Sequence, residues 1–417
     1  MIETLVNAWK IPELRKKIIF TLLMFTVFRL GAHVPIPGID RETLAGMFSS
    51  QLFGWVDIIS GGSFKNLTVF AMGIIPYINA SIIIQLLTMV VPYFEALAKE
   101  GNEGRKKMTQ YTRYGAVGLG LMQALVMSFY LRQAMVSPNM GSVLVCTVTL
   151  TAGTAFLMWL GELITEHGIG NGISLIIFAG IASRLPAGAT TIVSYVTEGD
   201  TSIITALLVL VVAVLMITGV VAVQEGQRRI PVQYAKRVIG RKVYGGQSTH
   251  IPMKINQAGV IPIIFAMAIL TFPSIIAGLF PDNSFAQWIT TVMGYRHPAY
   301  IITYSLLIFL FTYFYTAATF NTADVADNMR KNGGFIPGLR PGRPTAEYLD
   351  KVLSRLTFSG ATFLTIIALM PTLFQAFSGM NLYFGGTSLL IAVGVALDTM
   401  KQIESHLLMR HYQGFMK

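Results

Sequence analysis

Long apolar blocks follow one another along almost the whole chain. Because an α-helix rises about 1.5 Å per residue, roughly 20 apolar residues cross the hydrocarbon layer of a bilayer, which is about 30 Å thick. Strands and ordinary core helices need shorter runs. The pattern therefore predicts an all-α polytopic membrane protein with about ten transmembrane helices. The blocks fall near residues 18–36, 67–92, 114–133, 142–161, 169–187, 202–223, 257–280, 299–320, 357–377 and 387–408.

Composition agrees with this prediction. Of the 417 residues, 53% are hydrophobic and 12% are charged, whereas about a quarter of the residues of a soluble domain are charged. The single cysteine, Cys146, lies in the fourth block, so no internal disulfide can form. The first block is longer than the apolar core of a signal peptide, and no small-residue cleavage pattern follows it, so we expect it to be retained.

Lys and Arg are distributed unevenly among the connections between the blocks. Most of the 31 Lys and Arg residues lie at the two ends of the chain and in the connections after the second, sixth and eighth blocks. The positive-inside rule places such connections in the cytoplasm. We therefore expect both termini to be cytoplasmic.

Two of the basic connections, residues 225–256 and 321–356, are far longer than a link between neighbouring helices needs. Such segments can lie on anionic lipid, or they can dock an acidic partner or ribosomal RNA, whose phosphates attract Arg and Lys. Pro and Gly shape residues 337–344 into a fixed tip, which lipid binding would not require, so docking is favoured. The candidate docking residues are Arg228, Arg229, Lys236, Arg237, Arg241, Lys242, Arg340 and Arg343.

Two pairs of segments indicate an internal repeat. Residues 73–80 agree with residues 259–266 at five of eight positions, and residues 172–177 agree with residues 386–391 at four of six. Each match is offset by five blocks, and an odd number of spans per half inverts the second half in the membrane. We therefore predict inverted halves at residues 1–187 and 188–417, around a central pathway. Pro76 and Pro262, which match each other, should kink or start their helices.

The matched segments are apolar where a coupled transporter would carry carboxylates or His. They offer isoleucines instead, which in most membrane helices contact lipid or pack, but which could converge as a constriction that gates by dewetting. Metal-protease and nucleotide-binding motifs are missing, so neither an enzyme nor a cofactor is predicted. A secondary transporter of a small solute remains the alternative. The candidate ring residues are Ile78, Ile82, Ile173, Ile177, Ile264 and Ile391.

The connection between the first two blocks contains an apolar run that is too short to span a bilayer. It could be an interfacial helix or a re-entrant piece that fills the outer cavity, and its terminal Gly pair could act as a hinge. The run comprises Leu52, Phe53, Gly54, Trp55, Val56, Asp57, Ile58, Ile59, Ser60, Gly61 and Gly62.

Several motifs in one order make the chain similar to a known family. They lie at residues 73–78, 81–87, 110–115, 168–174, 234–237, 247–252 and 335–342. At these residues, and nearly from end to end, the chain resembles the SecY/Sec61-alpha family of channel subunits of protein translocases.

The resemblance implies a passive channel in the bacterial plasma membrane, through which unfolded secretory polypeptides cross and membrane segments leave sideways. It implies that the six isoleucines form the pore ring and that residues 52–62 form a plug. The implied partners are SecE, SecG, the ribosome and the motor ATPase SecA, which would hydrolyse the ATP. The implied polar contacts of a lateral gate are Asn79, Gln85, Asn256 and Gln257.

Overall fold

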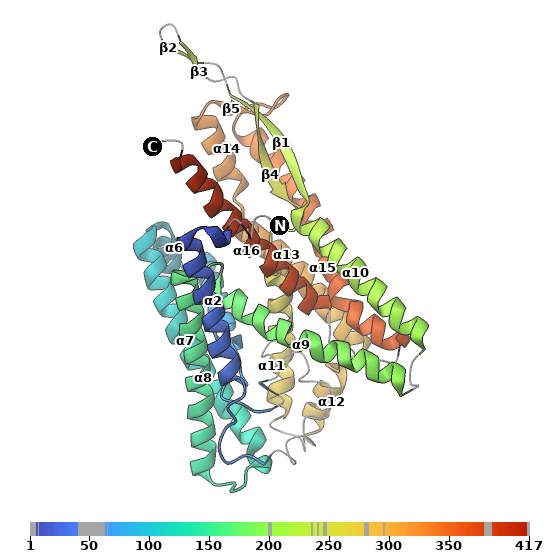
Figure 1. Ribbon diagram of the computed structural model, residues 1–417. Helices are drawn as coiled ribbons and strands as arrows, with labels where there is room; N and C mark the ends of the chain where they lie inside the picture. Colours follow the sequence, from blue (N-terminus) through green and yellow to red (C-terminus); the bar gives the residue numbers. More distant parts are fainter. Residues whose placement is uncertain are drawn as a thin grey trace.

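A bundle of long helices carries a strand-bearing lobe at one end (Figure 1). The computed structural model describes residues 6, 8–40, 63–64, 66–198, 202–234, 237–239, 242–244, 248–278, 283–294, 297–378 and 386–414. The predicted plug, residues 52–62, therefore lies outside the described residues.

Each of the ten predicted blocks overlaps one long helix, in the predicted order. Among the described residues, six helices are long and apolar enough to cross a membrane by themselves, and the bent pair α5–α6 adds a seventh. The ten helices are α2 (Pro12–Gly31), α5 (Ile75–Val90), α7 (Asn102–Tyr130), α8 (Met140–His167), α9 (Gly172–Thr197), α10 (Ile203–Glu225), α11 (Ile261–Gly278), α13 (Pro298–Thr319), α15 (Arg343–Ser378) and α16 (Gly386–Gly414).

Shorter elements connect these helices. The short helices are α6 (Pro92–Lys99), η2 (Leu131–Ala134), α12 (Ser284–Val292) and α14 (Thr322–Lys331). The strands are β1 (Gln227–Tyr234), β2 (Arg237–Ile239), β3 (Lys242–Tyr244), β4 (Ser248–Lys254) and β5 (Gly334–Phe335).

The internal repeat is visible in how α5 and α11 begin. Gly73 has φ 57° and Gly259 has φ 63°, a left-handed conformation that favours glycine, and each lies two residues before its helix. Pro76 and Pro262 are the second residues of α5 and α11, where proline's missing N–H would have had no helical partner. Both prolines therefore start a helix rather than kink one.

Helices pack in the same order in the two halves. Helices α5, α7, α8 and α9 pack consecutively, and so do α11, α13, α15 and α16. Contacts of α9 with α16 and of α5 with α11 join the halves. Helix α9 continues to Thr197, so the predicted end of the first half at residue 187 falls within this helix.

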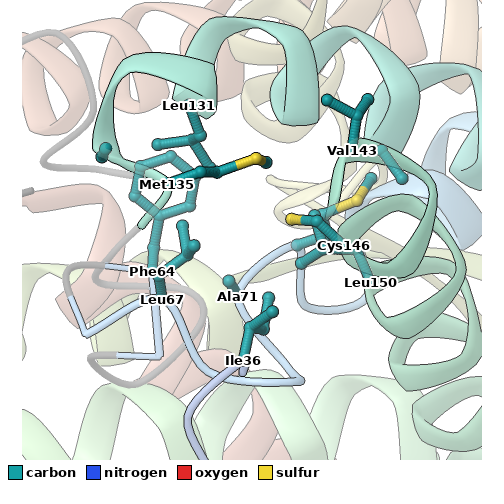
Figure 2. Packing of buried hydrophobic residues seen from close by; sticks show 12 residues of the cluster. Ile36, Phe64, Leu67, Ala71, Leu131, Met135, Val143, Cys146 and Leu150 are labelled. Carbon is teal, nitrogen blue, oxygen red and sulfur yellow. The ribbon is translucent and has the colours of Figure 1, made fainter. Parts of the chain in front are cut away.

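The second apolar block is only partly helical. Its first residues, 67–74, form turns, and nearly all of these residues are buried within the N-terminal half. Leu67 and Ala71 pack with Ile36, Leu131 and Leu150, and Figure 2 shows these side chains converging from separate segments. This packing holds the turn segment in place, so that α5 can begin inside the bundle.

The lobe is a small folded unit made from the two long basic connections. Strands β4, β1 and β5 form an antiparallel sheet in that order, and β2 pairs with β3. Ile230 and Val232 alternate with exposed residues along β1 and are buried against Met329 and Leu349 of α14 and α15. A shared apolar core thus fixes the two connections to each other.

Candidate channel constriction

Five of the six candidate ring isoleucines meet in one apolar cluster between the halves. Ile177 and Ile391 are buried in it, and Ile78, Ile173 and Ile264 are half-buried against it. These residues come from α5, α9, α11 and α16, the four helices that carry the matched segments. The repeat and the cluster therefore involve the same residues.

The sixth candidate, Ile82, lies one helical turn beyond Ile78 on α5. It packs against the neighbouring cluster, which contains Ile263, Phe265 and Leu390 of α11 and α16. Ile82 therefore lies at the contact between α5 and the C-terminal half, beside the five-residue cluster.

Three of the helices begin almost at their cluster isoleucine. Helix α5 starts at Ile75, α9 starts at Gly172 and α11 starts at Ile261, so Ile78, Ile173 and Ile264 lie in the first turn or just after it. Asn171 caps α9 by accepting a hydrogen bond from the Ser174 N–H at 3.2 Å. The cluster is thus fixed at helix ends rather than at mid-helix positions.

Chemically the cluster is apolar and stiff. Its isoleucines are branched at Cβ, which restricts the side-chain rotamers, and they offer no hydrogen bond to a passing group. An ion would lose its hydration shell there without replacement. A nearby ion pair, with Arg113 Nε 2.7 Å from Glu162 Oε1, links α7 to α8.

The four candidate gate residues lie on or next to α5 and α11. Asn79 and Gln85 are half-buried on α5, and Asn256 and Gln257 precede α11. Asn256 donates a hydrogen bond from Nδ2 to the Gly259 carbonyl oxygen at 3.0 Å, while its buried Oδ1 has no partner among the described residues. The structure brings α5 and α11 into contact, but no hydrogen bond among the described residues joins the two pairs.

The candidate docking residues lie on the lobe where the structure describes them. Arg228 and Arg229 are exposed on β1, and Arg340 is exposed at a tip whose Gly338 and Gly342 have positive φ. Arg343 pairs with Glu347 at 2.9 Å. Arg237 and Lys242 belong to the β2–β3 hairpin, and Lys236 and Arg241 lie outside the described residues.

The shared core of the lobe was not predicted from the sequence. The signal was present, because Ile230, Val232 and Tyr234 alternate with polar residues in the manner of a half-buried strand. The many basic residues in this connection instead indicated a charged surface segment.

The inverted halves and the apolar cluster between them define a multi-pass membrane protein of the inverted-repeat transport class.

Comparison with known proteins gives the family. The SecY family model matches residues 68–400. The chain is 49% identical to the protein translocase subunit SecY of Halalkalibacterium halodurans and covers 100% of both chains. It is 46% identical to the subunit of that name from Thermotoga maritima, over 99% of this chain and 97% of the relative. The chain belongs to the SecY family.

Solved structures agree in fold. A structure described as a protein conducting channel matches with a TM-score of 0.68 at 17% identity, over 95% of this chain and 96% of that one. Sec61 in the canine ribosome–channel complex from the endoplasmic reticulum matches with a TM-score of 0.64 at 16% identity, over the same shares.

Proposed function

We propose that the chain is the protein-conducting channel of a translocase, and that the isoleucine cluster is its constriction. The observation that carries the proposal is the meeting of Ile78, Ile173, Ile177, Ile264 and Ile391 from four helices at the junction of the halves. A ring without hydrogen-bonding groups does not select a substrate sequence, and its branched side chains can close around an extended chain.

The contact between α5 and α11 is the proposed lateral gate. Separation of these helices would open a path from the constriction to lipid, through which membrane segments of a substrate leave. Asn256 supports this role. Its buried Oδ1 has no hydrogen-bond donor within the described part of the chain in this arrangement, and because an unsatisfied buried acceptor costs free energy, a second arrangement of the helices that supplies a donor would be favoured. Asn79, Gln85 and Gln257 would be the other polar contacts.

The exposed basic lobe is the proposed docking surface for partners. The match to Sec61 in a ribosome–channel complex supports a ribosome as one partner. The second proposed partner is the motor ATPase SecA, which would hydrolyse the ATP that drives transport. SecE and SecG would complete the complex. The proposed location is the bacterial plasma membrane, with both termini cytoplasmic, as the distribution of Lys and Arg supports.

Replacing the cluster isoleucines tests the constriction. We expect Gly at Ile78, Ile264 and Ile391 to raise the ion conductance of planar bilayers that contain the complex, because the side chains that exclude water are removed. The matched control is Ile83→Gly, since Ile83 is exposed on the same helix α5. Equal conductance of the triple variant and the control would refute the assignment.

A further inference from the structure

Two short helices occupy equivalent places in the two halves. Helix α6 follows α5 and precedes α7, and helix α12 follows α11 and precedes α13. Since α5 and α11 are repeat partners, α6 and α12 are partners too. The inversion of the halves puts them on opposite faces of the membrane, and Figure 1 places them toward opposite ends of the bundle.

Helix α6 carries an exposed aromatic group. The axis bends by 99° between α5 and α6. The Tyr93 side chain reaches Tyr111 of α7, with 3.2 Å between the hydroxyl oxygens, and the Phe94 ring contacts both tyrosine rings edge-on, with centroids 5.4 and 5.7 Å away. Tyr93 is nevertheless 56% exposed, and Leu97 is buried. The aromatic group is therefore braced by α7 and still open to the surroundings.

The length of α7 indicates how deep the aromatic group of Tyr93, Phe94 and Tyr111 lies in the bilayer. From Tyr111 to Tyr130, α7 rises about 28 Å at 1.5 Å per residue, close to the hydrocarbon thickness of about 30 Å. The first turns of α7, before Tyr111, then project from the hydrocarbon layer with their charged side chains, such as Lys106 and Glu103. If the segment from Tyr111 to Tyr130 spans the hydrocarbon layer, Tyr111 lies at its boundary, and so does Tyr93, whose hydroxyl oxygen is 3.2 Å from that of Tyr111.

Helix α12 also carries exposed aromatic rings on one face and a buried residue on the other, although its rings pack on each other, whereas those of α6 also contact α7. The Phe285 and Trp288 rings stack with centroids 5.9 Å apart and are 65% and 59% exposed. Ala286 is buried on the other face, and Met293, just after the helix, packs against the core shared by α11 and α13. Asn283 caps the helix by accepting a hydrogen bond from the Phe285 N–H at 3.0 Å.

Aromatic side chains with polar neighbours, at the ends of membrane spans, are typical of the interface between headgroups and acyl chains. We propose that α6 and α12 are interfacial anchor helices, which insert Tyr93 with Tyr111 into the headgroup region of one leaflet and Phe285 with Trp288 into that of the other. On α6, an ion pair between Lys99 and Glu95 at 2.7 Å is exposed, and the hydrogen bond from Lys99 lowers the pKa of Glu95.

The anchors would hold the ends of α5 and α11 at fixed depths in opposite leaflets. Both helices carry cluster isoleucines near their other ends, at Ile78 and Ile264. When the halves separate, each helix can then pivot about its anchored end without sliding across the bilayer.

Fluorescence quenching by labelled lipids tests the depth of both anchors. The chain has four tryptophans, Trp9, Trp55, Trp159 and Trp288. Replacing the first three by Phe leaves Trp288 as the reporter of α12. Replacing all four by Phe and adding Tyr93→Trp gives a reporter for α6. The matched control adds Val214→Trp to the same background, because Val214 is exposed at the middle of α10.

The proteins are reconstituted in phosphatidylcholine and phosphatidylglycerol vesicles, with a nitroxide either on the headgroup or near the end of the acyl chain. We expect the headgroup label to quench Trp288 and the Tyr93→Trp reporter about twofold more than the deep label, because interfacial rings lie roughly 5–10 Å below the surface. The reverse order is expected for the Val214→Trp control.

Two results would overturn the proposal. Strong quenching by aqueous acrylamide without quenching by either lipid label would place the rings in water. Protection from acrylamide and from both lipid labels would mean that protein covers them. Phe285→Cys in a Cys146→Ser chain, labelled with a polarity-sensitive dye, repeats the test of α12 without tryptophan replacement. The measurement does not require translocation, so it stands apart from the proposed function.

Discussion

Side-chain volume at single residues sets how closely the helices around the isoleucine cluster approach one another. Gly172, the first residue of α9, is an example, because a Cβ there would collide with the Gly161 carbonyl oxygen of α8 and lie 2.8 Å from Ile164 Cβ. The next residue is Ile173, a member of the cluster. The absence of one methyl group at Gly172 thus allows α9 to present Ile173 at the junction of the halves.

Replacement of this glycine should destabilise the protein. We expect Gly172→Ala to lower the free energy of unfolding by about 1–3 kcal/mol, the usual cost of overpacking. Gly118→Ala in α7 has open space around the new methyl group and should be neutral or stabilising by up to about 1 kcal/mol, since Ala favours a helix over Gly. Thermal unfolding in detergent compares the two variants; equal stability would contradict the close-approach argument.

Helices were predictable from the sequence wherever the length of an apolar segment alone determines that it forms a membrane-spanning helix. All ten blocks contain a helix, because no other structure satisfies the backbone of so long an apolar segment in lipid. The start of α5 was not predictable, because residues 67–74 are as apolar as a helix and only their packing with residues such as Ile36 and Leu131 fixes them as turns. The repeat led to six candidate isoleucines, of which five share one cluster, whereas the place of Ile82 beside that cluster depends on tertiary packing.

A cysteine pair tests the contact between α5 and α11. Ile82 of α5 and Ile261 of α11 pack against the same core. In a Cys146→Ser chain, we expect oxidised Ile82→Cys with Ile261→Cys to block entry of a signal sequence, because the two helices can no longer separate. Photo-crosslinking of a signal peptide measures entry, and each single cysteine is the control. Entry that continues after verified cross-linking would refute the gate.

The molecule as a whole has one strongly basic end. The net charge is +11, and the lobe built from both long connections presents Arg228, Arg229 and Arg340 on a rigid core. Long-range attraction to a partner of opposite charge should therefore weaken as salt screens these charges.

Charge reversal at the tip tests the docking surface. We expect Arg340→Glu to reduce SecA-driven export into vesicles at least about tenfold, since losing one charge-assisted contact costs roughly 1.5–3 kcal/mol. Lys106→Glu is the control, because Lys106 is an exposed cation on α7, outside the two connections that build the lobe. Protease protection of a preprotein measures export. Equal export by the two variants would exclude Arg340 from docking.

Helices α5, α9 and α11 each begin next to a cluster isoleucine, and this has an electrostatic consequence. A helix N-terminus carries about half a positive charge, which originates in aligned peptide dipoles. Three such termini lie within three residues of Ile78, Ile173 and Ile264, so the proposed constriction combines apolar side chains with an electropositive backbone. If this cluster is the constriction, we expect small anions to be favoured over small cations whenever the ring is wide enough to admit either.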